Sequence, residues 1–200
     1  NREGLSWRHV HLFAMDEFLD WEGRPVPESH PLSFGGFLRR ELLGALDRRL
    51  RPAADRLVVP HPFRIDEASE RIRAAGGIDC CFGGIGYHGH IAFNDPPVAD
   101  FEDPHLIKIV ELDHACRQQQ VNDGCFPNLD AVPRHAFSLT VSIFRRARRL
   151  SIHVPGPRKA AAVQATIEGP ITTACPASIL RLHPEATLFV DRASAQLLRT

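Results

Sequence analysis

Apolar residues recur along the chain in two patterns that alternate. Short apolar runs predict buried strands, whereas apolar positions spaced three and four residues apart predict helices with one buried face. Helices are expected over residues 34–46, 66–75, 157–168 and 193–198. Strands are expected over residues 9–15, 57–60, 78–82, 106–112, 136–143, 150–154 and 187–190.

Strands that alternate with helices favour an α/β fold. We expect a mostly parallel sheet with helices on both faces, a Rossmann-like three-layer sandwich, because helical crossovers usually join parallel strands. No repeat, low-complexity tract or linker interrupts the sequence, so residues 1–200 are interpreted as a single domain. In such a fold the ligand site lies at the carboxyl ends of the strands.

Charge and composition narrow the class of partner. The 24 Lys and Arg balance the 24 Asp and Glu, so net charge gives no reason to expect nucleic acid or an anionic membrane. No apolar run is long enough to span a bilayer. The five cysteines form no CxxC pair and lie mostly in apolar runs. We therefore expect reduced core thiols in a cytoplasmic protein that acts on a small molecule.

The segment after residues 78–82 carries the densest candidate chemistry. Four glycines lie within seven residues, Gly84 and Gly86 among them, and His88, His90 and Asp95 accompany or follow them. Glycines let backbone N–H groups approach an anionic or hydroxylated ligand, and imidazole exchanges protons near neutral pH. Because a nearby acid orients such a ring, the pattern is typical of an acid–base site.

Two other interpretations of this segment stay open. A glycine-rich stretch is also typical of a tight connecting turn. His88 and His90, completed by Asp95, Asp100 or Asp103, have the residue types of a metal site. Glycines beside both histidines make a poorly rigid ligand cage, so we expect neither a metal nor a cofactor.

A second constellation is the acidic pair Asp16 and Glu17, which follows the first apolar run. Side chains alternate along a strand, so one of the two is expected to face the ligand crevice. A partly desolvated carboxylate there is suited to act as a general base toward a carbon acid. The alternative is a surface acid or a helix cap.

Motifs spread over nearly the whole chain resemble those of one family. Residues 13–18, FAMDEF, are similar to F-x-M-D-E-Y, and residues 84–96, GIGYHGHIAFNDP, to G-x-G-x-D-G-H-I-A-F-N-E-P. The similarity continues through residues 132–140, 154–169 and 180–184. The family is that of the glucosamine-6-phosphate deaminases and isomerases, which is related to the 6-phosphogluconolactonases.

The resemblance implies conversion of an aldose phosphate to a ketose with loss of ammonia. It implies that Asp16 moves a proton between C2 and C1 and that His90, partnered by Asp95, opens the sugar ring. Lys159 matches a phosphate-binding lysine. The expected catalytic residues are therefore Asp16, His88, His90 and Asp95, and the expected substrate-binding residues are Gly84, Gly86, Glu17, Lys159 and Arg117.

The chain departs from the family pattern in four places. His88 stands where the family has aspartate, and Asp95 is one methylene shorter than the family's glutamate. The deaminases' phosphate-binding arginine has no clear match, because glutamines fill residues 118–120 and only Arg117 remains nearby. The family's first strand, helix and Gly/Thr-rich phosphate loop are not recognised, so the sequence is expected to lack an N-terminal portion.

The expected activity is the conversion of glucosamine 6-phosphate to fructose 6-phosphate and ammonia, or a close variant, in amino-sugar catabolism. Two alternatives stay open: hydrolysis of a sugar-lactone phosphate, and non-catalytic sensing of a sugar phosphate. The expected partner is a small sugar phosphate rather than nucleic acid or a membrane, and a homo-oligomer stays open.

Overall fold

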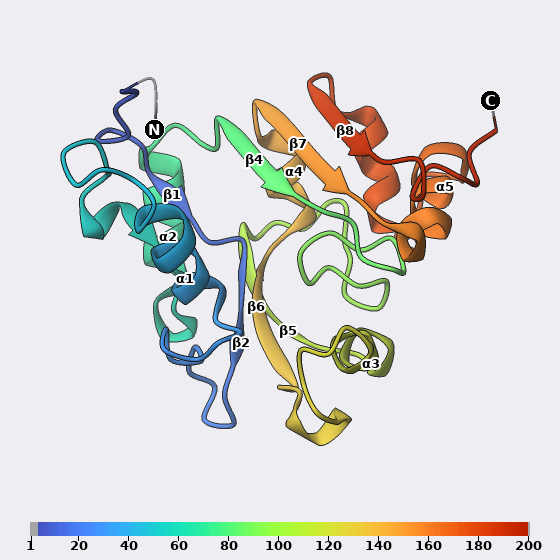
Figure 1. Cartoon of the computed structure of the whole chain (residues 1–200), viewed down its shortest axis with the longest axis horizontal. Coiled ribbons are helices and arrows are strands. Elements are labelled where there is room, and N and C mark those ends of the chain that lie inside the picture. The colour runs from blue at the N-terminus through green and yellow to red at the C-terminus, as the bar shows by residue number, and fades with distance from the viewer. Residues whose placement is uncertain (1–3, 200) are drawn as a thin grey trace.

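The computed structural model describes residues 4–199 (Figure 1). Its strands are β1 (Leu12–Phe13), β2 (Asp16–Leu19), β3 (Leu57–Val58), β4 (Cys80–Gly83), β5 (Ile107–Glu111), β6 (His135–Leu139), β7 (Arg149–Val154) and β8 (Ala186–Val190). Its α-helices are α1 (Phe34–Phe37), α2 (Ile65–Ala74), α3 (His114–Asn122), α4 (Val141–Arg146) and α5 (Ala160–Glu168). A π-helical segment, Leu38–Leu43, continues α1, and short 3₁₀ segments include η5 (Pro157–Lys159) before α5 and η6 (Pro176–Leu182) after it.

The strands form three separate sheets. β1 pairs with β3, and β4, β7 and β8 form a second parallel sheet. The third sheet, β2–β6–β5, is antiparallel throughout. The α/β class is confirmed, whereas the expectation of mostly parallel strands is wrong for this third sheet. Antiparallel strands need no helical crossover, so the alternation of helices and strands along the sequence could not reveal the pairing.

Two apolar segments differ from their expected type. The run at residues 136–143 is not one strand: β6 ends at Leu139, Thr140 is extended at the N-cap position, and α4 begins at Val141. Residues 193–198 form turns instead of a helix, with the Asp191 carboxylate accepting a hydrogen bond from Ser194 N–H at 2.7 Å. Between residues 4 and 199, no helix is both long and apolar enough to cross a bilayer.

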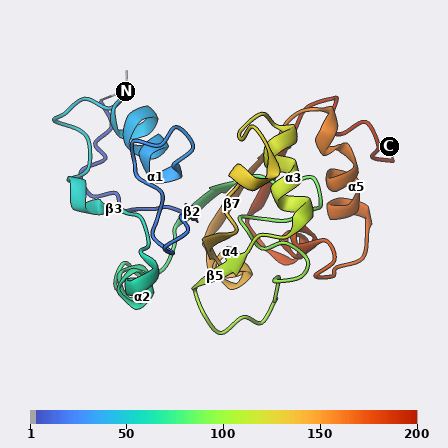
Figure 2. The same ribbon diagram turned by 90° about the horizontal axis from the view of Figure 1, so that it is seen from below.

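The core consists of two clusters on either side of the antiparallel sheet. The larger cluster includes Ile72, Phe137, Phe144, Ile152 and Val163. The smaller cluster centres on Phe18, whose ring centroid lies 5.2 Å from that of Phe93. Figure 2 shows β3, α1 and α2 on one side of β2 and α3, α4 and α5 on the other. The β2 strand therefore lies where these two parts of the molecule meet.

All five cysteines are free thiols. Cys81, Cys116 and Cys175 are buried, as expected. Cys80 and Cys125 are exposed, so the expectation of a core position is wrong for these two. Cys80 belongs to a strand whose alternate side chains point outward, which explains why a position in an apolar run did not bury it.

Candidate active site

The glycine-rich loop after β4 folds into a tight turn that buries His90. The N–H of Gly86 donates to the carbonyl of His90 at 2.9 Å, and Gly89, with φ of +74°, donates to Gly86 at 3.1 Å. The imidazole of His90 packs directly over Gly86. A Cβ atom at position 86 would lie 2.0 Å from two ring atoms. Gly86 therefore gives the histidine ring the space that it occupies.

His90 and Asp95 form a buried pair. Nδ1 of His90 lies 2.7 Å from Oδ1 of Asp95, and the two side chains are 10% and 4% exposed. The close approach is not aligned as a hydrogen bond, so the carboxylate acts on the ring mainly through its charge. This contact leaves Nε2 as the ring nitrogen available to a ligand.

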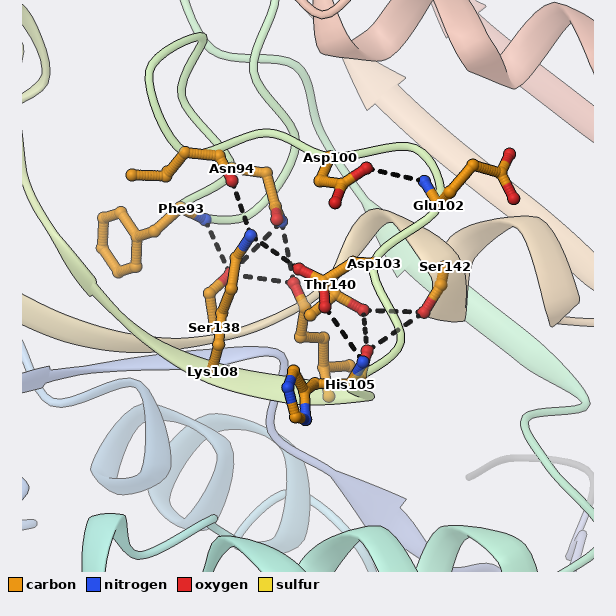
Figure 3. Close-up of polar contacts among 12 residues, drawn as sticks. Phe93, Asn94, Asp100, Glu102, Asp103, His105, Lys108, Ser138, Thr140 and Ser142 are labelled. Atoms are coloured by element: carbon orange, nitrogen blue, oxygen red, sulfur yellow. Dashed lines mark hydrogen bonds and ion pairs between the residues drawn. The ribbon is translucent and has the colours of Figure 1, made fainter.

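Asp16 is joined to the same loop through Ser138. Asp16 begins β2 and lies opposite Ser138 in the ladder with β6. The Ser138 hydroxyl oxygen accepts a hydrogen bond from Phe93 N–H at 3.1 Å, and Nδ2 of Asn94 donates to the carbonyl of Leu139 at 2.8 Å (Figure 3). Phe93 and Asn94 lie between His90 and Asp95 in the chain, so these bonds fix the His90 loop to the β2–β6 ladder.

The electrostatics of this region follow from burial. Burial, followed by the charge of Glu17, raises the pKa of Asp16 to about 7. Burial, followed by the charge of Asp95, also raises the pKa of the Cys116 thiol. The β2–β6 ladder and the hydrogen bonds of Ser138 and Asn94 join the strand that carries Asp16 to the loop that carries His90 and Asp95.

Glu17 has a structural role. Its carboxylate is 1% exposed and accepts hydrogen bonds from Ser33 Oγ at 2.8 Å, Gly35 N–H at 2.9 Å and Phe34 N–H at 3.2 Å. These donors belong to the start of α1, where unpaired N–H groups favour an anion. The expected role in substrate binding has no support in these contacts, and the helix-cap alternative describes the side chain.

Lys159 belongs to a polar cluster that borders the glycine-rich loop. Its Nζ lies 4.2 Å from the centroid of the Tyr87 ring, while Tyr87 Oη donates to Asp123 at 2.5 Å. Arg158 pairs with the same carboxylate at 2.9 Å. Burial lowers the pKa of Lys159, the Arg158 charge lowers it further, and Asp123 partly opposes both effects. Two cations at the start of α5 therefore share one acidic partner.

Three other expected site residues lie outside these contacts. The Arg117 guanidinium donates to the carbonyl of Leu129 at 2.5 Å, so the helix α3 arginine is held by its own connecting turn. The expectation that Arg117 binds substrate stays a prediction. His88 and Gly84 are exposed, and within residues 4–199 the His88 side chain has no hydrogen bond or ion pair. Gly84 instead lies close to β7, since a Cβ there would lie 3.1 Å from the carbonyl oxygen of His153.

The metal alternative finds no ligand set in the described part of the chain. Among residues 4–199 no group of three His, Cys, Asp or Glu side chains is placed to hold an ion. His90 is buried while His88 is exposed, and the Asp103 carboxylate is paired with Lys108 at 2.8 Å. Figure 3 shows the latter pair among the contacts beside Ser138. The absence of a metal from the mechanism stays a prediction.

Sequence reasoning missed Ser138, Tyr87, Asp123 and Arg158. Arg158 directly precedes Lys159, and a second cation beside a phosphate-binding lysine was a signal available from the sequence. Ser138 offered no such signal, because its importance depends on pairing between β2 and β6.

The fold and these contacts define an α/β protein with an acid–base site built from two carboxylates and a histidine. Residues 1–189 match the family described as glucosamine-6-phosphate isomerases/6-phosphogluconolactonase, and the chain belongs to this family.

Curated relatives of the chain are named glucosamine-6-phosphate deaminases. The glucosamine-6-phosphate deaminase of Corynebacterium kroppenstedtii is 37% identical over 204 residues, which cover 99% of this chain and 74% of that protein. The glucosamine-6-phosphate deaminase of Pseudarthrobacter chlorophenolicus is 31% identical over 200 residues, which cover 98% of this chain and 73% of that protein.

Solved structures agree with this placement. A monomeric glucosamine-6-phosphate deaminase superposes with a TM-score of 0.84 at 26% identity, covering 98% of this chain and 78% of that one. The 6-phosphogluconolactonase from Trypanosoma cruzi superposes with a TM-score of 0.69 at 18% identity, covering 96% of this chain and 74% of that one. The second similarity shows the shared fold alone.

Proposed function

We propose that the chain converts glucosamine 6-phosphate to fructose 6-phosphate and ammonia. One observation carries the proposal: the β2–β6 ladder and Ser138 join Asp16, whose pKa is raised to about 7, to the loop of the buried His90–Asp95 pair. A base whose pKa lies near the working pH is suited to remove a weakly acidic C–H proton and return it. The names of the curated relatives support this choice of substrate.

The proposed reaction assigns one proton transfer to each group. His90 Nε2 moves the proton that opens the pyranose ring and exposes the C1 aldehyde, while Asp95 holds the ring from the Nδ1 side. Asp16 takes the C2 proton as a C1–C2 double bond forms and the C1 oxygen gains a proton from solvent. The proton on Asp16 is then delivered to C1 as the amino nitrogen releases one to solvent. This leaves an imine at C2. Water adds to that imine, and ammonia leaves as the C2 ketone forms.

Lys159 and Arg158 are proposed to bind the sugar phosphate. Both cations lie at the start of α5, where the helix dipole also favours an anion. A phosphate that reaches Lys159 competes with Asp123 for these charges. Lys159→Ala should raise KM by about tenfold or more with a smaller effect on kcat.

The test is an assay of the purified chain with glucosamine 6-phosphate, following ammonia and fructose 6-phosphate together. Asp16→Asn should abolish both products, whereas the control Asp20→Asn, a nearby acid that pairs with Arg24, should keep them. An Asp16→Asn variant that still hydrolyses 6-phosphogluconolactone would instead select the hydrolase alternative. Tight sugar-phosphate binding without any product would select the sensor.

We also infer a cytoplasmic location, since five free thiols suit a reducing compartment. The parallel β4–β7–β8 sheet supports a Rossmann-like arrangement for that half of the molecule. The oligomeric state stays open, and sedimentation of the purified chain would establish it.

A further inference from the structure

A hollow lined by arginines lies in the N-terminal part of the molecule. Its volume is about 570 Å³, and among residues 4–199 its lining contains no acidic residue. The lining residues are Arg8, Arg48, Arg51, Pro52, Ala53 and Arg56.

The four guanidinium groups make no ion pair within residues 4–199, and the one acid whose pKa an arginine of this set lowers is Asp47, which Arg49 binds. Within the same residues, Arg48 and Arg51 make no side-chain hydrogen bond either. Arg49, between them in the chain, points elsewhere and pairs with Asp47 at 3.4 Å. Four like charges around one space repel each other, and an anion in that space would relieve the repulsion.

The arginines come from two segments that are fastened together. Trp7 N–H donates to the carbonyl of Leu50 at 2.6 Å, and Arg8 Nε donates to the carbonyl of Arg49 at 2.6 Å. Arg56 is held in the same way, since its Nη1 donates to the carbonyl of His9 at 3.4 Å. These contacts fix two of the guanidinium groups before any ligand arrives, which reduces the entropy lost on binding.

We propose that this hollow binds a small molecule carrying two or more linked phosphate groups. Guanidinium groups bind phosphate oxygens in pairs, and four of them match the charge of a pyrophosphate group better than that of a single phosphate. The volume falls in the range of small-molecule sites. The chain carries zero net charge, which favours a compact ligand over a nucleic acid.

The site shares no residue with the proposed active site, and the proposal does not depend on the proposed function. It is nevertheless connected to Asp16 through the chain. Arg56 directly precedes β3, and the partner of β3, β1, leads to Asp16 three residues after it ends. A ligand that joins residues 8 and 56 therefore tightens the β1–β3 pair and should raise the temperature of unfolding.

The test is calorimetric titration of the full chain with inorganic pyrophosphate and with orthophosphate at constant ionic strength. The wild-type chain should bind one pyrophosphate, about tenfold or more tightly than orthophosphate. Arg48→Gln with Arg51→Gln should weaken this binding by about tenfold or more. Within residues 4–199 neither side chain makes a hydrogen bond or ion pair, so the variant should fold normally.

The matched control is Arg39→Gln with Arg49→Gln, which removes the same charge from ion-paired arginines outside the hollow. This control and Lys159→Ala should keep the affinity of the wild-type chain. Equal weakening in both double variants would reduce the effect to general attraction of anions and overturn the proposal. Loss of binding in Lys159→Ala would assign the pyrophosphate to the proposed active site instead. An absence of saturable binding to the wild-type chain would also overturn the proposal.

A second readout is the unfolding midpoint at saturating pyrophosphate. It should rise for the wild-type chain and the control and stay unchanged for Arg48→Gln with Arg51→Gln. A rise of equal size in all three would contradict the assignment to the hollow.

Discussion

Ser138 lies opposite Asp16 in the β2–β6 ladder, and its hydroxyl oxygen also accepts a hydrogen bond from the segment that follows His90. One fully buried serine thus positions the proposed base relative to the proposed ring-opening histidine. The two groups come from distant parts of the chain, and this contact joins the strand that carries one to the loop that carries the other.

Replacing Ser138 should therefore affect turnover as well as stability. Ser138→Ala leaves Phe93 N–H buried without an acceptor and should cost about 1–3 kcal/mol of unfolding free energy. It should also lower kcat by about tenfold, because the His90 loop is no longer fixed to β6. Both are measured by denaturant unfolding and steady-state kinetics.

Ser142→Ala is the matched control. Its hydroxyl is also buried and donates to the carbonyl of His105 at 3.2 Å, away from the His90 loop (Figure 3). It should lose stability with little change in kcat. Equal kcat losses in the two variants would show that Ser138 acts only through stability.

Gly86→Ala should displace the His90 ring. The added methyl group would lie 2.0 Å from the imidazole, so the ring must leave its place beside Asp95. We expect kcat to fall by about a hundredfold or more. Gly83→Ala adds the same group where the nearest side-chain atom is 3.4 Å away and should be tolerated. Wild-type activity in Gly86→Ala would contradict the role of His90.

The pH dependence of kcat/KM should report Asp16. A base works in its ionised form, so activity should rise with pH through the region of the raised pKa, about 7. Glu17→Gln removes one cause of that shift and should move the acid limb to lower pH. The same variant weakens the cap of α1 and should reduce stability by about 1–3 kcal/mol. If the acid limb of the pH profile stays at the same pH in Glu17→Gln, the pKa of that limb belongs to a group other than Asp16.

Asp16→Asn should stabilise the protein while it abolishes activity. The folded-state pKa of Asp16 lies above the ordinary aspartate value of 3.8, so ionisation opposes folding as pH rises from about 4 to 7, and the full cost persists above 7. Part of the side chain remains accessible, and we expect a gain of about 1–3 kcal/mol at pH 8 that vanishes below pH 4. Comparing chemical unfolding at the two pH values checks this. A loss of stability at pH 8 would contradict the buried environment.

Residues close in sequence were the easiest to predict. His90 and Asp95 lie on one loop, so local spacing was enough to indicate their contact. The approach of Asp16 to that loop depends on the pairing of β2 with β6. The periodicity of apolar residues does not predict which strands pair. The acidic pair illustrates the limit: alternation predicted that one acid faces the site, but only the fold showed that Glu17 is bound to the first turn of α1.

For the cations proposed to bind phosphate, the sequence predicted the residue type but not the direction in which each side chain points. Arg117 lies in the expected segment, yet its guanidinium turns back to the carbonyl of Leu129. Arg158 supplies a cation beside Lys159 instead, with Asp123 as its partner. The direction of a long side chain depends on the hydrogen-bond acceptors that the tertiary structure places within its reach. The sequence alone does not predict these acceptors.

The pairing of β1 with β3 involves two residues in each strand, and Asp16 follows almost at once. A ladder this short should open at a much lower free-energy cost than the sheet of β4, β7 and β8. Its amide protons should therefore be among the first to exchange with solvent. The proposed base is thus attached to a part of the molecule that frays early. Warming should therefore abolish the reaction while most of the protein is still folded.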